Sequence, residues 1–175
     1  MPSSQKTVYF VRHAECENNI GVVKEGVGPA ESPRQVEYSD LFVERVRPSV
    51  THPLGKNDPR RNIIENEVVK NFHLPGWRHS DEENFDDLKA RAMKMLRYLS
   101  EKPEKNILVV THGMILKVMA ACAVFGEGVT GMECSRFMGA FHGENTGITV
   151  FKYDPERNPD FPWWLWIWND HAHLG

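Results

Sequence analysis

The sequence predicts an α/β layered fold. Two β-prone apolar runs, residues 7–11 and 106–110, are continuous rather than alternating. Such runs are typical of strands buried on both faces of a parallel sheet. Between them, residues 81–99 place apolar side chains three or four positions apart, the spacing of one helical face. Strands that alternate with helices in this way favour helical layers packed on a sheet.

The first part of the chain is expected to hold few long elements. Residues 21–59 are rich in glycine and proline, which interrupt regular structure, although residues 36–43 are compatible with a short strand. Asp58 followed by Pro59 is typical of a helix N-cap and the first turn of the helix. A helix is therefore predicted from there to about Asn71.

Helices and strands alternate again after residue 80. Ser80 with Glu83 is predicted to form a capping box for the helix over 81–99, and Pro103 helps to end that helix. A buried helix is predicted over 114–125, with Gly126 as its C-terminal stop. Two late strands complete the series, over residues 147–153 and 163–168.

The composition fits one globular domain over residues 1–175. No apolar run reaches the roughly 20 residues of a membrane helix, and a net charge of -3 does not favour nucleic-acid binding. The N-terminus lacks the features of a signal peptide, so a cytoplasmic location is expected. Three separated cysteines favour reduced thiols over a disulfide framework or a zinc site. We therefore expect neither a nucleic-acid nor a membrane partner.

Both long apolar strands end in a histidine, in Arg12-His13 and in His112-Gly113. Ligands of open α/β sheets collect beyond the carboxyl ends of the strands, so the two ends are expected to share a pocket. An imidazole can attack phosphorus, and the arginine fork and the amides that begin at Gly113 suit phosphate oxygens. The pattern indicates phosphoryl transfer with a small phosphorylated substrate or inorganic phosphate, and with no metal or other cofactor.

Three motifs in order along the chain carry a resemblance to a known family. They are Val-Arg-His-Ala-Glu at 11–15 with Asn19 six positions after the histidine, Val-Val-Thr-His-Gly at 109–113, and Glu-Asn-Thr-Gly-Ile-Thr-Val at 144–150. This set resembles the histidine phosphatase (phosphoglycerate mutase-like) superfamily. The resemblance implies a three-layer α/β/α sandwich with a mostly parallel sheet. It also implies phosphomonoester hydrolysis through a phosphohistidine.

The resemblance also assigns roles. His13 matches the nucleophile. Glu44, which forms a Glu-Arg pair with Arg45, matches the general acid that protonates the leaving oxygen. Arg45 is expected beside the substrate, as is Gly113. The residues that match phosphoryl binding are Arg12, Asn19 and His112.

The segment between His13 and Glu44 departs from the family pattern. It holds about 30 residues and lacks the family's helix, strand and second phosphate-binding arginine, which resembles an internal deletion. One donor to a transition-state charge is typically worth about 3–4 kcal/mol, or roughly 100- to 1,000-fold in rate, so low activity is expected. Arg34 is the candidate substitute for the missing arginine.

The missing strand would leave the strand over 106–110 at an open edge of the sheet. Either residues 36–39 occupy the place beside it, or a second subunit covers it in a homodimer. Three alternative functions stay open: a phospholigand- or partner-binding pseudoenzyme, a phosphoglycerate mutase-type phosphotransferase, and a metal-dependent hydrolase that uses the histidines as ligands.

Overall fold

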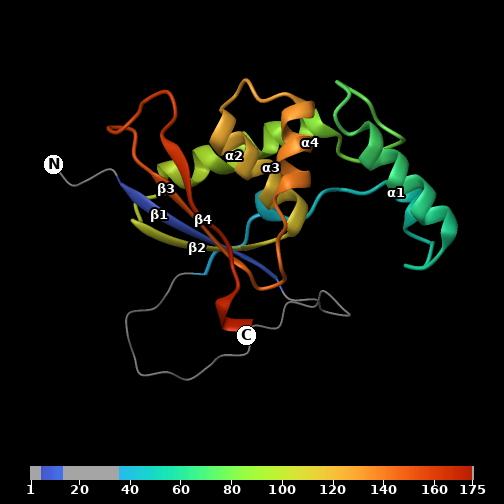
Figure 1. The fold of residues 1–175 in the computed structure, drawn as a ribbon, viewed down its shortest axis with the longest axis horizontal. Helices are drawn as coiled ribbons and strands as arrows, with labels where there is room; N and C mark the ends of the chain where they lie inside the picture. The colour runs from blue at the N-terminus through green and yellow to red at the C-terminus, as the bar shows by residue number, and fades with distance from the viewer. Residues whose placement is uncertain (1–4, 14–35, 175) are drawn as a thin grey trace.

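The computed structural model of the chain describes residues 5–13 and 36–174. Its four strands are β1 (Lys6–Arg12), β2 (Asn106–Thr111), β3 (Ile148–Tyr153) and β4 (Trp163–Asp170), in the sheet order β2-β1-β3-β4 (Figure 1). β1 and β2 are parallel, whereas β3 is antiparallel to both β1 and β4. The α/β class is confirmed, but the expectation of a mostly parallel sheet is wrong because the sheet is mixed.

In the part of the chain that the structure describes, four α-helices accompany the sheet: α1 (Pro59–Asn71), α2 (Phe85–Glu101), α3 (Gly113–Phe125) and α4 (Gly131–Ala140). Figure 1 shows α2, α3 and α4 on one face of the sheet, with α1 to the side. α3 contacts β1, β4 and both neighbouring helices. Among the described residues, α2, α3 and α4 therefore form a helical layer that covers one face of the sheet.

Strands β1 and β2 are buried on one face only among the described residues. Val8 and Phe10 point to the helices and are fully buried. On the opposite face, Leu108 and Val110 are 66 % and 63 % exposed. The prediction of strands buried on both faces is therefore wrong for this part of the chain, because a continuous apolar run does not show how many faces are covered.

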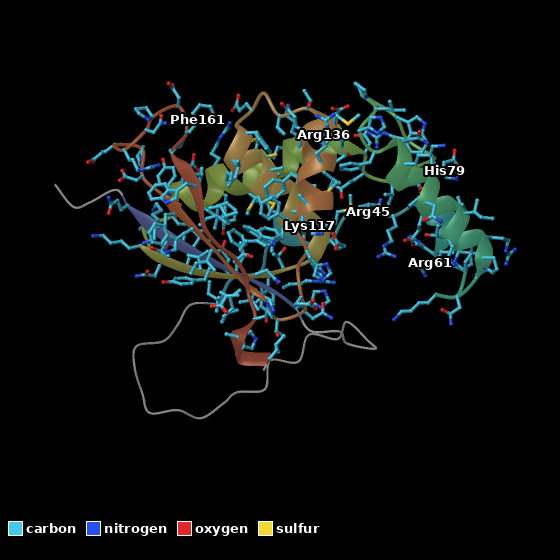
Figure 2. The ribbon with its side chains drawn as sticks, in the orientation of Figure 1. Arg45, Arg61, His79, Lys117, Arg136 and Phe161 are labelled. Carbon is cyan, nitrogen blue, oxygen red and sulfur yellow. The ribbon has the colours of Figure 1, made fainter. Side chains whose placement is uncertain are left out.

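Helix α3 lies at the centre of the core. Eight of its residues are buried, and its neighbours surround it, which explains why it has no polar face. Figure 2 shows side chains filling the space between the helical layer and the sheet. The helix ends at Gly126, which has a φ of 75° that favours glycine. Both the helix and its stop agree with the prediction.

Residues 36–43 do not form the predicted short strand. They make a 3-10 turn at Asp40–Phe42, and the described sheet ends at β2. The place beside β2 is thus not filled by residues 36–39. Instead, Glu37 is ion-paired with Lys102 at 2.6 Å, which holds this segment beside the end of α2. Two further 3-10 turns are Ser49–Thr51 and Ala172–Leu174.

Polar caps mark the starts of α1 and α2. α1 starts after the Asp58 cap, as predicted. The capping box of α2 is formed by Asn84 and Asp87, so the predicted box that included Glu83 is wrong. Glu83 is ion-paired with Arg91 at 2.7 Å instead.

Candidate active site

The side chains of His13 and His112 lie next to each other at the carboxyl ends of β1 and β2. Their ring centroids are 4.3 Å apart, and the ring planes are inclined at 67°. The backbone N–H of His13 donates to the carbonyl oxygen of Thr111 at 3.0 Å, which continues the pairing of the two strands. The two imidazoles therefore share one site, as the positions of the motifs predict, while the roles assigned to them remain predictions.

Helix α3 begins at this pair of rings. His112 is its N-cap residue and Gly113 its first residue. A Cβ at Gly113 would lie 3.1 Å from Nε of Arg12, so glycine permits the guanidinium to approach the helix. Arg12 also donates to the carbonyl oxygen of Gly143. The predicted phosphate-binding arginine is thus placed beside the N-terminus of α3, where negative charge is favoured.

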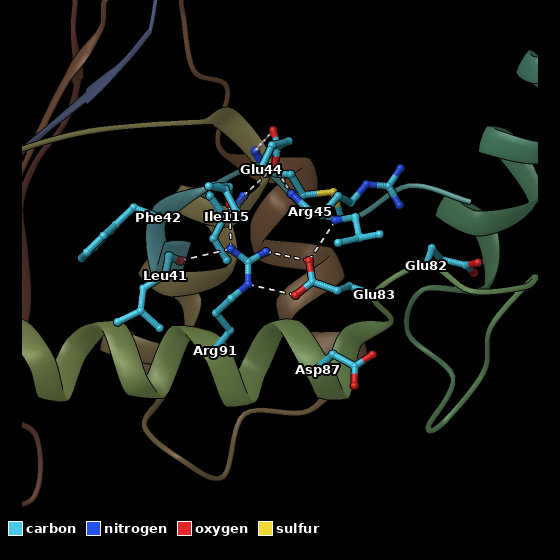
Figure 3. A network of polar contacts seen from close by, with 12 residues as sticks. Leu41, Phe42, Glu44, Arg45, Glu82, Glu83, Asp87, Arg91 and Ile115 are labelled. Carbon is cyan, nitrogen blue, oxygen red and sulfur yellow. Dashed lines mark hydrogen bonds and ion pairs between the residues drawn. The ribbon is translucent and has the colours of Figure 1, made fainter. Parts of the chain in front are cut away.

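The carboxylate of Glu44 lies at the same end of α3 (Figure 3). It accepts hydrogen bonds from the N–H groups of Met114 and Ile115, each at 3.3 Å, and from that of Arg45 at 2.9 Å. The negative charge of Glu44 also raises the pKa of His112. The predicted general acid and the predicted phosphate-binding histidine are therefore neighbours.

The environment of His112 favours its neutral form. Burial lowers its pKa below the ordinary value of 6.5, and the nearby charges of His13 and Arg91 lower it further. Glu44 acts in the opposite direction. A bound anion would add to the effect of Glu44, because negative charge stabilises the protonated imidazole.

Arg45 has a different environment from the one expected. It is buried, and its Nη1 atom has no hydrogen-bond partner among the described residues. Burial lowers its pKa, Arg47 lowers it further, and Glu65 raises it. Figure 3 shows its guanidinium pointing away from the carboxylate of Glu44, toward α1. The geometry therefore does not bring Arg45 to the histidines.

Lys117 is a second positive group close to Arg12. Burial lowers the pKa of Lys117, and the charge of Arg12 lowers it further. Its Nζ atom donates to the carbonyl oxygen of Met138 at 3.2 Å. Lys117, Arg12 and Gly113 line one pocket together with Trp168. Lys117 is not among the predicted site residues, although its position one helical turn after Gly113 is a usable signal.

Two of the predicted site residues, Asn19 and Arg34, lie outside the described residues. In residues 5–13 and 36–174, no group of three or more His, Cys, Asp or Glu side chains could hold a metal ion. No helix in the same ranges has the length and apolarity to cross a membrane.

Burial raises the pKa of the Cys122 thiol to about 12, and that of Cys134 to about 12 as well. Neither thiol is a thiolate nucleophile near neutral pH.

Comparison with solved structures finds the same fold in phosphatases. A phosphoserine phosphatase variant from Entamoeba histolytica, in complex with phosphoserine, has a TM-score of 0.63 and 16% identity, covering 97% of this chain and 100% of that chain. A candidate alpha-ribazole-5′-P phosphatase from Escherichia coli has a TM-score of 0.55 and 18% identity, covering 95% of this chain and 97% of that one. No curated protein matches the chain in sequence.

A family model, the histidine phosphatase superfamily (branch 1), matches residues 56–165. The match contains His112 and Gly113, whereas His13 and Glu44 precede it. The structure supplies what the match lacks, because it brings His13 and Glu44 to the end of α3 that carries His112. With more than half of its length matched, this chain belongs to the histidine phosphatase superfamily (branch 1).

Proposed function

We propose that this chain hydrolyses phosphomonoesters through a phosphohistidine on His13, without a metal ion. The carrying observation is the 4.3 Å separation of the His13 and His112 rings at the start of α3. Two imidazoles, the guanidinium of Arg12 and the N–H groups at the start of α3 suit one tetrahedral anion. Family membership and the phosphatase neighbours support phosphatase activity in general.

In the first step, a ring nitrogen of His13 attacks phosphorus, and the bond between phosphorus and the ester oxygen breaks. The carboxyl group of Glu44 gives its proton to the leaving oxygen, which departs as an alcohol. His112 donates a hydrogen bond to a phosphoryl oxygen, whose charge it stabilises. The substrate phosphate competes with Glu44 for the N–H groups at the start of α3, which frees the carboxyl group for this transfer.

In the second step, water attacks the phosphohistidine. The nitrogen–phosphorus bond breaks, and the carboxylate of Glu44 accepts the proton that the water loses. Inorganic phosphate leaves, and His13 and Glu44 return to their starting states. Phosphoryl transfer needs chiefly positioning and charge stabilisation, which the His112 imidazole, Arg12 and the α3 terminus supply.

The test is turnover of para-nitrophenyl phosphate in the presence of a chelator, with wild-type protein and His13→Ala. We expect metal-independent turnover that His13→Ala abolishes, and an acid-labile phosphoryl label on the wild-type protein alone. His142→Ala is the matched control, because this exposed imidazole contacts Glu144 and lies outside the ring pair. The control variant should keep full turnover.

Three results would replace the proposal with one of its rivals. Phosphate binding without turnover, in folded wild-type protein, indicates a phospholigand-binding pseudoenzyme. Turnover that returns only with added metal ion indicates a metal-dependent hydrolase. Transfer of the phosphoryl group between two substrate positions, without release of phosphate, indicates a mutase.

A further inference from the structure

The segment that carries Glu44 has little regular structure of its own. Residues 41–46 include only the end of the Asp40–Phe42 turn, and none of the strands in residues 5–13 and 36–174 pairs with them. The hydroxyl of Thr111 donates to the carbonyl oxygen of Phe42 at 2.7 Å, which ties the segment to the end of β2. Other contacts are needed to fix the residues that follow.

Arg91 of α2 supplies the first of these contacts (Figure 3). Its Nη1 atom donates to the carbonyl oxygens of Leu41 at 3.1 Å and Val43 at 2.7 Å. Both carbonyl groups precede Glu44 in the chain. A single guanidinium nitrogen therefore holds the backbone on the N-terminal side of the predicted acid.

Glu83, just before α2, holds the other side. Its Oε2 atom accepts a hydrogen bond from the N–H of Val46 at 2.9 Å, and its own N–H donates to the carbonyl oxygen of Val46 at 3.2 Å. The same carboxylate binds Arg91 in a bidentate manner, from Nε at 2.9 Å and from Nη2 at 2.7 Å. The ion pair thus joins the anchors before and after Glu44 into one unit.

This ion pair is shielded from solvent, with exposed side-chain fractions of 13% for Arg91 and 19% for Glu83. Shielded charge-assisted hydrogen bonds are stronger and more directional than those on the surface. The planar fork of arginine binds the carboxylate and the two carbonyl groups at once, which a lysine ammonium cannot do in the same geometry. The contacts therefore specify a position for the segment rather than merely attaching it.

From this arrangement we infer that Arg91 and Glu83 are positioning residues, which hold Glu44 at the start of α3 for proton transfer to the leaving oxygen. The inference rests on the proposed function, because the position of Glu44 matters to the reaction only if Glu44 serves as its acid. Neither residue is expected to touch the substrate.

Leaving-group chemistry separates positioning from general structural support. A nitrophenolate leaves without a proton, whereas an alkoxide needs one, so only alkyl phosphates depend on the general acid. General acid catalysis typically contributes about 100- to 10,000-fold. Displacing Glu44 should therefore lower kcat/KM for an alkyl phosphate by about 10- to 100-fold, and that for the aryl phosphate by less than about threefold.

The experiment compares para-nitrophenyl phosphate with glycerol 2-phosphate for wild type, Arg91→Gln and Glu83→Gln. Arg61→Gln is the matched control. It breaks an ion pair with Glu65 at 3.0 Å on α1, with similar exposed fractions of 20% and 27%, outside residues 41–46. We expect both test variants to change the ratio of kcat/KM for the two substrates, and the control to leave it unchanged.

A double-mutant cycle completes the test. In a Glu44→Gln background, adding Arg91→Gln should cause no further loss on the alkyl phosphate, since the group that it positions is gone. Equal losses on both substrates, or an unchanged ratio in a folded variant, would overturn the positioning role alone. Wild-type protein that turns over neither substrate would overturn the proposed function itself. If circular dichroism shows that Arg91→Gln does not fold, Glu83→Gln decides the question.

Discussion

Replacement of Glu44 should affect stability and activity to different extents, depending on the residue introduced. The carboxylate accepts hydrogen bonds from three backbone N–H groups, two of which belong to Met114 and Ile115 at the start of α3. Glu44→Ala removes both acceptor oxygens and with them all three hydrogen bonds. Glu44→Gln retains one oxygen that can accept, while it removes the negative charge and the transferable proton.

The size of the expected stability loss follows from the position of Glu44 at the N-terminus of α3. Loss of a side-chain acceptor at a helix N-terminus typically costs about 1 kcal/mol, and loss of a favourable charge there about 0.5 kcal/mol. Glu44→Ala should therefore lower the free energy of unfolding by about 1–2 kcal/mol, which is a fall in Tm of roughly 2–8 °C for a chain of this size. Glu44→Gln should lose about half as much stability.

Thermal denaturation followed by circular dichroism measures these changes, and kcat/KM for an alkyl phosphate measures activity. Activity should fall about equally in both variants, because neither can donate the proton. Glu133→Gln is the control, since Glu133 belongs to the capping box of α4 and should affect stability alone. A Glu44→Ala protein as stable as wild type would refute the contact with α3. Full activity in Glu44→Gln would refute its role as the acid.

Two further predictions concern packing and pH. A Cβ at Gly131 would lie 2.6 Å from the backbone oxygen of His73, whereas one at Gly139 of the same helix would meet no atom within 4 Å. Gly131→Ala should thus lower the free energy of unfolding by about 1–3 kcal/mol, whereas Gly139→Ala should raise it by up to about 1 kcal/mol. Urea denaturation measures both changes. The same change in both variants would contradict the packing of α4. The folded-state pKa of His112 lies below 6.5, so the unfolded chain binds more protons as pH falls below that value, and stability should fall with it. His112→Gln should reduce this loss in urea denaturation above and below pH 6.5, and an unchanged pH dependence would contradict the burial of the imidazole.

The convergence of His13 and His112 could be predicted because it follows from local facts. Each histidine ends an apolar strand, and parallel neighbours bring such ends together. The direction of the later strands could not be obtained in this way. β3 and β4 form an antiparallel pair, and strands that pair in either direction have similar local composition.

The anchors of the Glu44 segment were also beyond sequence analysis. Arg91 has the helical spacing of an ordinary polar residue of α2, and Glu83 matches a capping pattern equally well. Their pairing depends on the approach of residues 41–46, which only tertiary packing decides. α4 did carry a local signal in the capping box of Thr130 and Glu133. Glycines at both ends of α4 weaken its pattern.

The central place of α3 in the core has a consequence for the timescale on which the site changes. Amide hydrogens in the most enclosed element of a domain usually exchange with solvent only when the whole domain opens. The amides at the start of α3, beside the histidine pair, belong to that element. Glu44 instead lies on an irregular segment that side chains such as Arg91 hold in place. Fluctuations in the native state would therefore reposition the carboxyl group of Glu44 long before they disturb the N–H groups of α3 that bind the anion.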